Sequence, residues 1–248
     1  MFLNYLEKLH ELQTIDEVWT LHVEQMAEFG FDRLLYGFTR FRTQNSFGDR
    51  EDLLMLTNHS VEYLENFIET GMYFNAPMVK WAAENVGACS WGWMSEHSDS
   101  LTESEREVVE YNQKMGIVAG YSISFKEISS RSKGAIGLVA KKGIGQTEID
   151  ALWKEKGREI IQMNNVAHLK MTTFPFPTLR RPLTKRQREA LEWVGDGKTM
   201  QDIATIMGLS RPTVEKHLRL AREALDVETT AQAVLKASNQ NQIFLLGS

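Results

Sequence analysis

The residues whose types and spacing could do chemistry lie in one stretch, TMQDIATIMGLSRPTVEKHLRLAREAL, which starts at Thr199 and ends at Leu225. The pattern predicts two helices: Thr199 caps the first, Gly208 ends it and Ser210 caps the second. The second helix has an apolar side, and its other side carries Glu215, Lys216, Arg219 and Arg222. Such side chains can contact phosphates and base edges, so the stretch is typical of a DNA-binding helix-turn-helix.

The candidate DNA contacts divide into two roles. We expect Glu215, Lys216 and Arg219 to reach base edges, because Lys or Arg can bind guanine and glutamate can accept from cytosine. The expected phosphate contacts are Ser210, Arg211, Thr213 and Arg222, and Thr199 completes the DNA-binding set. The alternative is an ordinary pair of packed helices without a nucleic-acid partner.

Two further helices are expected around this pair. Thr184 with Gln187, and Thr229 with Gln232, have the spacing of capping boxes. The result is an all-α module of four helices. This module resembles the C-terminal DNA-binding domain of LuxR-type transcription factors through Leu183, Thr184, Arg186, Glu189, Leu191, Gly197, Ile203, Ala204, Ser210, Thr213, Val214, His217, Ala231 and Ala233.

The net charge of −5 is unevenly distributed along the chain. From Arg180 onward there are 11 Lys and Arg against 8 Asp and Glu, which leaves 17 basic and 25 acidic residues before it. Only the tail is therefore suited to polyanionic DNA. Because its positive excess is small, we expect tight DNA binding to need a dimer.

Composition limits the remaining possibilities. The 248 residues suit one large or two smaller domains. No run approaches the roughly 18 apolar residues of a membrane span, and the N-terminus does not read as a signal peptide, so we expect a cytoplasmic protein without a membrane partner. Cys89 is the single cysteine, which excludes an internal disulfide and a cysteine-based zinc site.

The sequence before the tail predicts an α+β domain. Helices are expected over 2–29, 60–71, 102–115 and 148–169, and strands over 33–42, 53–57, 119–126 and 134–141. Residues 89–93 are expected to form a loop or a short strand. This order favours a mostly antiparallel sheet with helices on both faces. Residues 1–171 then form the first domain, 172–182 a proline-rich and fairly stiff linker, and 183–248 the helix-turn-helix domain.

Aromatic residues are dense between Tyr36 and Trp93, which indicates either a core or the wall of a small-molecule site. Tyr36, Phe38 and Phe67 are candidates for such a wall, because aromatic rings offer large apolar faces. No catalytic constellation accompanies them: the sequence has no phosphate-binding glycine loop, nucleophile elbow or paired-histidine motif. We therefore expect no enzyme, although an activity on a small acyl compound is the alternative from another class. A phosphorylation-driven response regulator would need a front domain of alternating strands and helices.

Residues 1–169 also resemble, more loosely, the N-terminal acyl-homoserine-lactone domain of LuxR-type proteins, which has an αβα sandwich fold. The anchors are Pro77-Met78-Val79 and Trp91. The resemblance implies that Trp91 walls the lactone ring and that Tyr63 donates to the lactone carbonyl where relatives have tryptophan. It also implies that His59 faces the pocket.

One departure from the family matters for the ligand. Ala76 stands where relatives usually have an aspartate that accepts the ligand's amide N–H. A buried amide without a partner loses roughly 1–3 kcal/mol. Asn75 or Ser124 could compensate, or the pocket could take another ligand or none.

The sequence therefore predicts a regulator that senses an acyl-homoserine lactone and binds promoter DNA as a homodimer. A solo regulator with a non-lactone ligand, or without a ligand, is the alternative. Expected partners are double-stranded DNA, the autoinducer, a second copy of the chain and RNA polymerase. We expect no metal and no cofactor beyond the small-molecule ligand.

Overall fold

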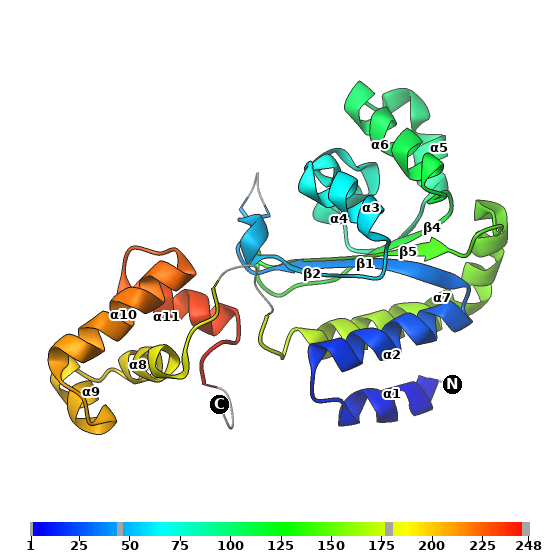
Figure 1. Cartoon of the computed structure of the whole chain (residues 1–248). Coiled ribbons are helices and arrows are strands. Elements are labelled where there is room, and N and C mark those ends of the chain that lie inside the picture. The colour runs from blue at the N-terminus through cyan, green and yellow to red at the C-terminus, as the bar shows by residue number, and fades with distance from the viewer. Residues whose placement is uncertain (1, 44–46, 177–180, 245–248) are drawn as a thin grey trace. The chain divides into compact units, whose positions relative to one another are not determined.

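The chain forms two units in the computed structural model, which describes residues 2–43, 47–176 and 181–244 (Figure 1). The first unit comprises Met1–Phe47 and Leu54–Met171. The second comprises Gly48–Leu53 and Thr172–Ser248. A short segment from between two strands of the first unit thus belongs to the second.

A five-stranded sheet organises the first unit. Its strands are β1 (Phe31–Thr39), β2 (Leu54–Thr57), β3 (Gly87–Ser90), β4 (Gly120–Ser124) and β5 (Lys133–Ala140). They lie in the order β2-β1-β5-β4-β3, and every neighbouring pair is antiparallel. The predicted antiparallel sheet is confirmed.

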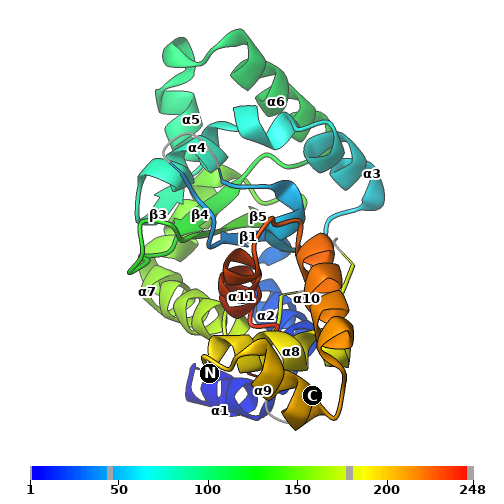
Figure 2. The same cartoon turned by 90° about the vertical axis from the view of Figure 1, so that its left-hand side faces the viewer.

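Helices cover both faces of this sheet (Figures 1 and 2). One face carries α1 (Phe2–Glu11), α2 (Ile15–Glu28) and α7 (Gln146–Met171). The other carries α3 (Val61–Leu64), the helical turns η2 (Glu65–Glu69) and η3 (Met72–Asn75), α4 (Pro77–Glu84), α5 (Gly92–Glu96), η4 (Ser98–Ser100) and α6 (Glu103–Lys114). The arrangement confirms the expected αβα sandwich.

Local sequence explains where these elements begin. Thr14 and Glu17 form a capping box at the start of α2, and Thr102 and Glu105 form one at the start of α6. The helix expected over 60–71 is instead α3 followed by a π-helical turn, η2. Residues 89–93 divide between the end of β3 and the start of α5.

The second unit contains a helical core. Its helices are α8 (Lys185–Gly195), α9 (Met200–Met207), α10 (Arg211–Leu225) and α11 (Thr230–Asn239). Thr184, Thr199 and Thr229 each head a capping box. The buried side chains include Leu183, Leu191, Ile203, Met207, Val214, Leu218, Leu225 and Ile243. The expected four-helix module is confirmed.

Two peripheral segments join this helical core. The segment 48–53 contains the turn η1 (Arg50–Asp52), and Asp52 Oδ2 lies 2.6 Å from Lys236 Nζ on α11. The Gln240 side chain donates to Asp52 Oδ1 at 2.9 Å, and all three residues are buried. Of the expected linker, Phe176 is buried and its backbone N–H donates to Gln240 O, whereas 177–180 lie outside the described residues.

Candidate DNA interface and candidate ligand site

The turn between α9 and α10 has the backbone geometry that the sequence predicts. Gly208 adopts a left-handed conformation with φ 66° and ψ 34°, which ends α9. The Ser210 hydroxyl then accepts from Thr213 N at the start of α10, and Pro212 lies in the first turn. At the start of α9, hydrogen bonds from Thr199 lower the pKa of Asp202. The caps fix the angle at which α10 leaves the turn.

Helix α10 has one buried and one exposed side. Val214, Leu218, Ala221 and Leu225 pack into the core of the second unit. The exposed side carries Arg211, Glu215, Lys216 and Arg219. Arg219 Nη1 lies 2.5 Å from Glu223 Oε1, one turn further along the helix. A polar helix face of this kind is what the major groove admits.

The other predicted DNA contacts lie near this face but already make internal hydrogen bonds. Arg222 Nη1 donates to Thr230 Oγ1 at 2.9 Å, which ties α10 to α11. The hydroxyls of Ser210 and Thr213 lie 2.8 Å apart, and that of Thr199 donates to Asp202 at 2.6 Å. These four side chains therefore also shape the module.

In the first unit, a cluster that we call the aromatic layer lies between the sheet and α3–α6. Its buried members are Tyr63, Phe67, Ile68, Tyr73, Ala76, Val108, Ile117 and Val139. Leu35, Met55, Leu64, Met72, Val79, Trp91, Tyr111 and Met115 pack against them. The Tyr63 ring stacks on His59, Phe67 and Tyr111 at centroid distances of 4.6, 4.9 and 5.8 Å.

The structure brings four of the predicted ligand residues into this layer and places His59 against it. Those four are Tyr63, Phe67, Ala76 and Trp91. Ala76 is 4% exposed, so the position is buried although its side chain has no polar atom. Trp91 Nε1 donates to Ser122 Oγ on β4 at 3.0 Å, which holds the indole against the sheet.

Tyr36 and Phe38 do not join this layer. Side chains alternate along β1, and both rings lie on the opposite face of the sheet, where they contact His168 of α7. The Tyr36 hydroxyl bonds to His168 Nδ1 at 2.8 Å. The structure thus places them in the core under α2 and α7, apart from Trp91.

Asn75 and Ser124 are also placed away from an open ligand contact. Asn75 is exposed at the end of η3. Ser124 is buried, and its hydroxyl lies 2.8 Å from Ala82 O and 2.7 Å from Asn85 O at the end of α4. Neither geometry offers a clear substitute for the aspartate that is missing at Ala76.

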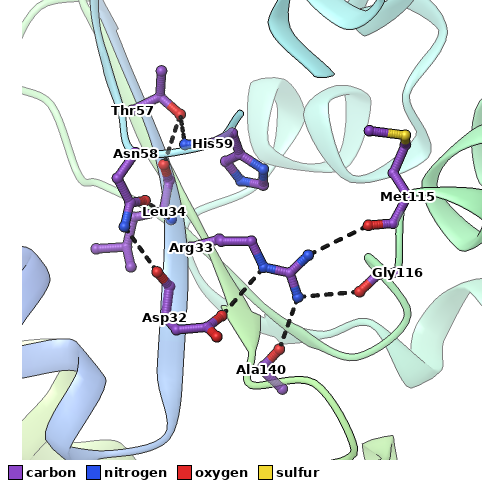
Figure 3. A network of polar contacts seen from close by, with 9 residues as sticks. All are labelled: Asp32, Arg33, Leu34, Thr57, Asn58, His59, Met115, Gly116 and Ala140. Atoms are coloured by element: carbon purple, nitrogen blue, oxygen red, sulfur yellow. Dashed lines mark hydrogen bonds and ion pairs between the residues drawn. The ribbon is translucent and has the colours of Figure 1, made fainter. Parts of the chain in front are cut away.

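His59 lies beside a cation at the edge of the layer (Figure 3). Burial and then the charge of Arg33 lower the pKa of His59 to about 4. The imidazole is therefore neutral at pH 7 and can both donate and accept a hydrogen bond. The Arg33 guanidinium bonds to Met115 O, Gly116 O and Ala140 O, which ties β1 to β5 and to the chain that follows α6.

Sequence reasoning missed two polar residues of α6. The Tyr63 hydroxyl donates to Asn112 Oδ1 at 3.0 Å. The hydroxyl of Tyr111 is buried and has no hydrogen-bond partner among the described residues. The sequence did indicate a helix here, because Val108, Tyr111 and Met115 follow the Thr102 cap at helical spacing. That spacing does not show where the side chains of this helix point.

No described helix is long and apolar enough to cross a membrane. Within the same ranges, no group of three or more His, Cys, Asp or Glu side chains could hold a metal ion.

Each of two parts of the chain matches a known family. Residues 14–171 match the family described as autoinducer binding domain, and residues 181–237 match bacterial regulatory proteins, luxR family. The chain is therefore a transcriptional regulator with a small-molecule domain and a helix-turn-helix. It belongs to the LuxR family, whose members among its relatives are named as transcriptional activators and not as enzymes.

Individual relatives are distant but span the chain. The transcriptional activator AnoR of Acinetobacter nosocomialis is 23% identical over 230 residues, which cover 90% of each chain. Escherichia coli SdiA shares the fold with a TM-score of 0.52 and 17% identity over 98% of each chain. A structure of SdiA in complex with octanoyl-rac-glycerol has a TM-score of 0.55 and is 16% identical in sequence. The match covers 96% of this chain and 93% of that one.

A further solved structure matches part of the chain. It is CepR2 from Burkholderia cenocepacia, described as an N-acylhomoserine-lactone-dependent LuxR family transcription factor. The TM-score is 0.54 at 15% identity, over 68% of this chain and 92% of that one.

Proposed function

We propose that the protein binds a small amphiphilic acyl compound, an acyl-homoserine lactone, in the aromatic layer and binds a promoter site as a homodimer. The observation that carries the ligand half is the layer itself. It is a stack of rings with Trp91 held by Ser122 and with the Tyr111 hydroxyl of α6 left without a described partner. Apolar walls with a few polar groups suit such ligands.

The DNA half rests on the exposed face of α10. Two copies of this helix, related by a two-fold axis, would enter successive major grooves of a roughly palindromic site. The tail has only three more basic than acidic residues from Arg180 onward, which favours binding by a pair of chains rather than one. Ligand binding would stabilise the folded first unit by linkage and thereby control the pairing.

Selection from a random DNA library, followed by fluorescence anisotropy, tests the DNA half. We expect a palindromic consensus, and Lys216→Ala should relax the preference at one base position in each half-site. Arg211→Ala should weaken binding to all sequences and reduce the salt slope by about one per chain. Arg186→Ala is the control, because that side chain pairs with Glu189 on α8. Absence of any selected sequence would contradict the proposal.

Purification from a host that makes no lactones tests the ligand half. The melting temperature and DNA affinity are measured with and without saturated N-acyl-homoserine lactones of four to twelve carbons. We expect at least one lactone to raise the melting temperature and to change the DNA affinity. If no lactone changes either quantity, the lactone assignment is lost.

A regulator with a non-lactone ligand, or with none, is the second candidate. Ala76 favours it, because this buried position offers no acceptor for a ligand amide N–H. The SdiA complex concerns an acyl glycerol, which has no amide, so such compounds belong in the same titration. A response to acyl glycerols alone would favour a non-lactone ligand, and DNA binding that ignores both would favour ligand-free action.

A further inference from the structure

We propose that the Tyr111 hydroxyl is a ligand-binding group that reads a carbonyl oxygen, so that the site accepts acyl esters and acyl amides alike. The inference rests on the proposed ligand function and deepens it. Tyr111 lies on α6 and packs against the same cluster that contains Ala76. Its side chain has one polar atom, and that atom is buried without a partner.

An unpaired buried hydroxyl calls for an explanation, because native proteins pair nearly all such groups. No described ring around Tyr111 bonds to its hydroxyl: Tyr63 lies nearly parallel at 12°, and the Tyr63 hydroxyl donates to Asn112. Val108 and Met115, which precede and follow Tyr111 by about one turn of chain, are apolar. A ligand that brings a polar atom into the layer would supply the missing partner.

The polar groups of this corner favour a carbonyl as that partner. A phenol hydroxyl donates one hydrogen bond. The Asn112 side-chain oxygen accepts from Tyr63, so this amide carbonyl is already committed within the protein. Meanwhile Ala76 provides no acceptor for an N–H. A site in which Tyr111 can donate and the side chain at position 76 cannot accept binds the carbonyl oxygen and gains nothing at position 76 from the amide hydrogen.

Two substitutions in the full chain separate binding from folding. Tyr111→Phe removes only the unpaired hydroxyl. Tyr121→Phe is the matched control, because its hydroxyl donates to Asp150 at 2.7 Å on the opposite face of the sheet. The probes are the N-acyl-homoserine lactone that gives the largest shift and the acyl glycerol of the same chain length. The readouts are the melting temperature without ligand and the dissociation constant from ligand-dependent melting.

The two variants should behave in opposite ways. Tyr111→Phe should keep or raise the melting temperature without ligand and weaken both probes about tenfold. Tyr121→Phe should lower the melting temperature and leave both affinities unchanged. In the wild type, the two probes should bind within about threefold of each other, because the amide hydrogen has no acceptor.

Each other outcome has a definite meaning. If both probes bind Tyr111→Phe as tightly as the wild type, the role of this hydroxyl is overturned and the proposed function stands. A fall in the melting temperature of Tyr111→Phe without ligand would show a structural partner and also overturn it. A lactone that binds more than tenfold tighter than the glycerol would refute the tolerance of esters. If no probe shifts the wild type, the inference and the ligand half of the proposed function fail together.

Discussion

The two faces of the sheet treat their buried polar groups differently. Under α2 and α7, Tyr5 bonds to His22 Nδ1 at 2.8 Å, and His22 Nε2 bonds to Asn164 Oδ1 at 3.0 Å. Asn164 Nδ2 in turn donates to Ile160 O. Each side-chain nitrogen and oxygen in this series of hydrogen bonds has a partner. A neutral His22 imidazole with its hydrogen on Nε2 is compatible with all of these bonds.

A second series of polar contacts on the same face also connects buried side chains. Tyr36 bonds to His168 Nδ1, and His168 Nε2 lies 2.9 Å from Glu127 Oε1. The aromatic layer on the other face instead leaves the Tyr111 hydroxyl unpaired. An unpaired buried group costs stability, and the proposed ligand role of the aromatic layer rests on the Tyr111 hydroxyl.

The largest expected effect comes from Gly120, where the sheet meets the layer. A Cβ there would lie 2.2 Å from Leu138 O and 3.0 Å from the Trp91 ring. Gly120→Ala should therefore destabilise the fold by about 3 kcal/mol or more, seen as a large loss of denaturation midpoint. Gly37→Ala in β1 is the control, since its Cβ would meet no atom within 4 Å. Equal effects would mean that close approach to Trp91 does not define this face.

His22 should make the α2–α7 face sensitive to acid. Burial lowers the pKa of His22 to about 4 from an unfolded value of 6.5, so the unfolded chain binds more protons between these values. His59, whose pKa is also lowered to about 4, adds a similar dependence on the other face. The His22 contribution to stability is complete above pH 6.5 and falls as the pH drops toward 4, by about 2 kcal/mol between pH 7.5 and 5. Urea denaturation at both pH values measures it. His22→Gln should reduce the change in unfolding free energy between these two pH values. An unchanged difference would mean that another group takes up the proton.

Tyr36→Phe tests a tyrosine whose hydroxyl has a hydrogen-bond partner, in contrast to Tyr111 on the other face of the sheet. Removal of its hydroxyl leaves His168 Nδ1 buried without a donor, at an expected cost of about 1.5 kcal/mol. The same change at Tyr111 should cost nothing, because no bond is lost there. Urea denaturation of both variants measures the difference. Similar losses at the two positions would remove the distinction between the faces.

Ser124 gives the smallest expected effect and qualifies the comparison. Its hydroxyl is committed to the carbonyl oxygens at the end of α4, although β4 also borders the layer. Ser124→Ala should lower the unfolding free energy by about 1 kcal/mol and leave ligand affinity unchanged. Thermal melting with and without ligand would detect both quantities. A loss of ligand affinity would instead return Ser124 to the site.

The sequence predicted much of the fold because caps and periodicities are local. The Thr199 and Ser210 caps depend on neighbours in the chain, and the structure has them as expected. The side of the sheet to which Tyr36 points is set by which helices cover it, and that depends on tertiary packing. The same holds for Tyr111: a helical spacing places its ring against the layer, but only the packed structure shows that its hydroxyl has no partner among the described residues.

The segment 48–53 bears on how this protein can be cut into pieces. A gene fragment that begins at Thr172 would encode all four helices of the second unit but not Asp52. Lys236 would then keep a buried position without the carboxylate that lies 2.6 Å from it, and Gln240 would lose its acceptor. Weak folding of such a fragment would reflect a missing counterion rather than a defective helix-turn-helix, and a fragment carrying Lys236→Met should fold better.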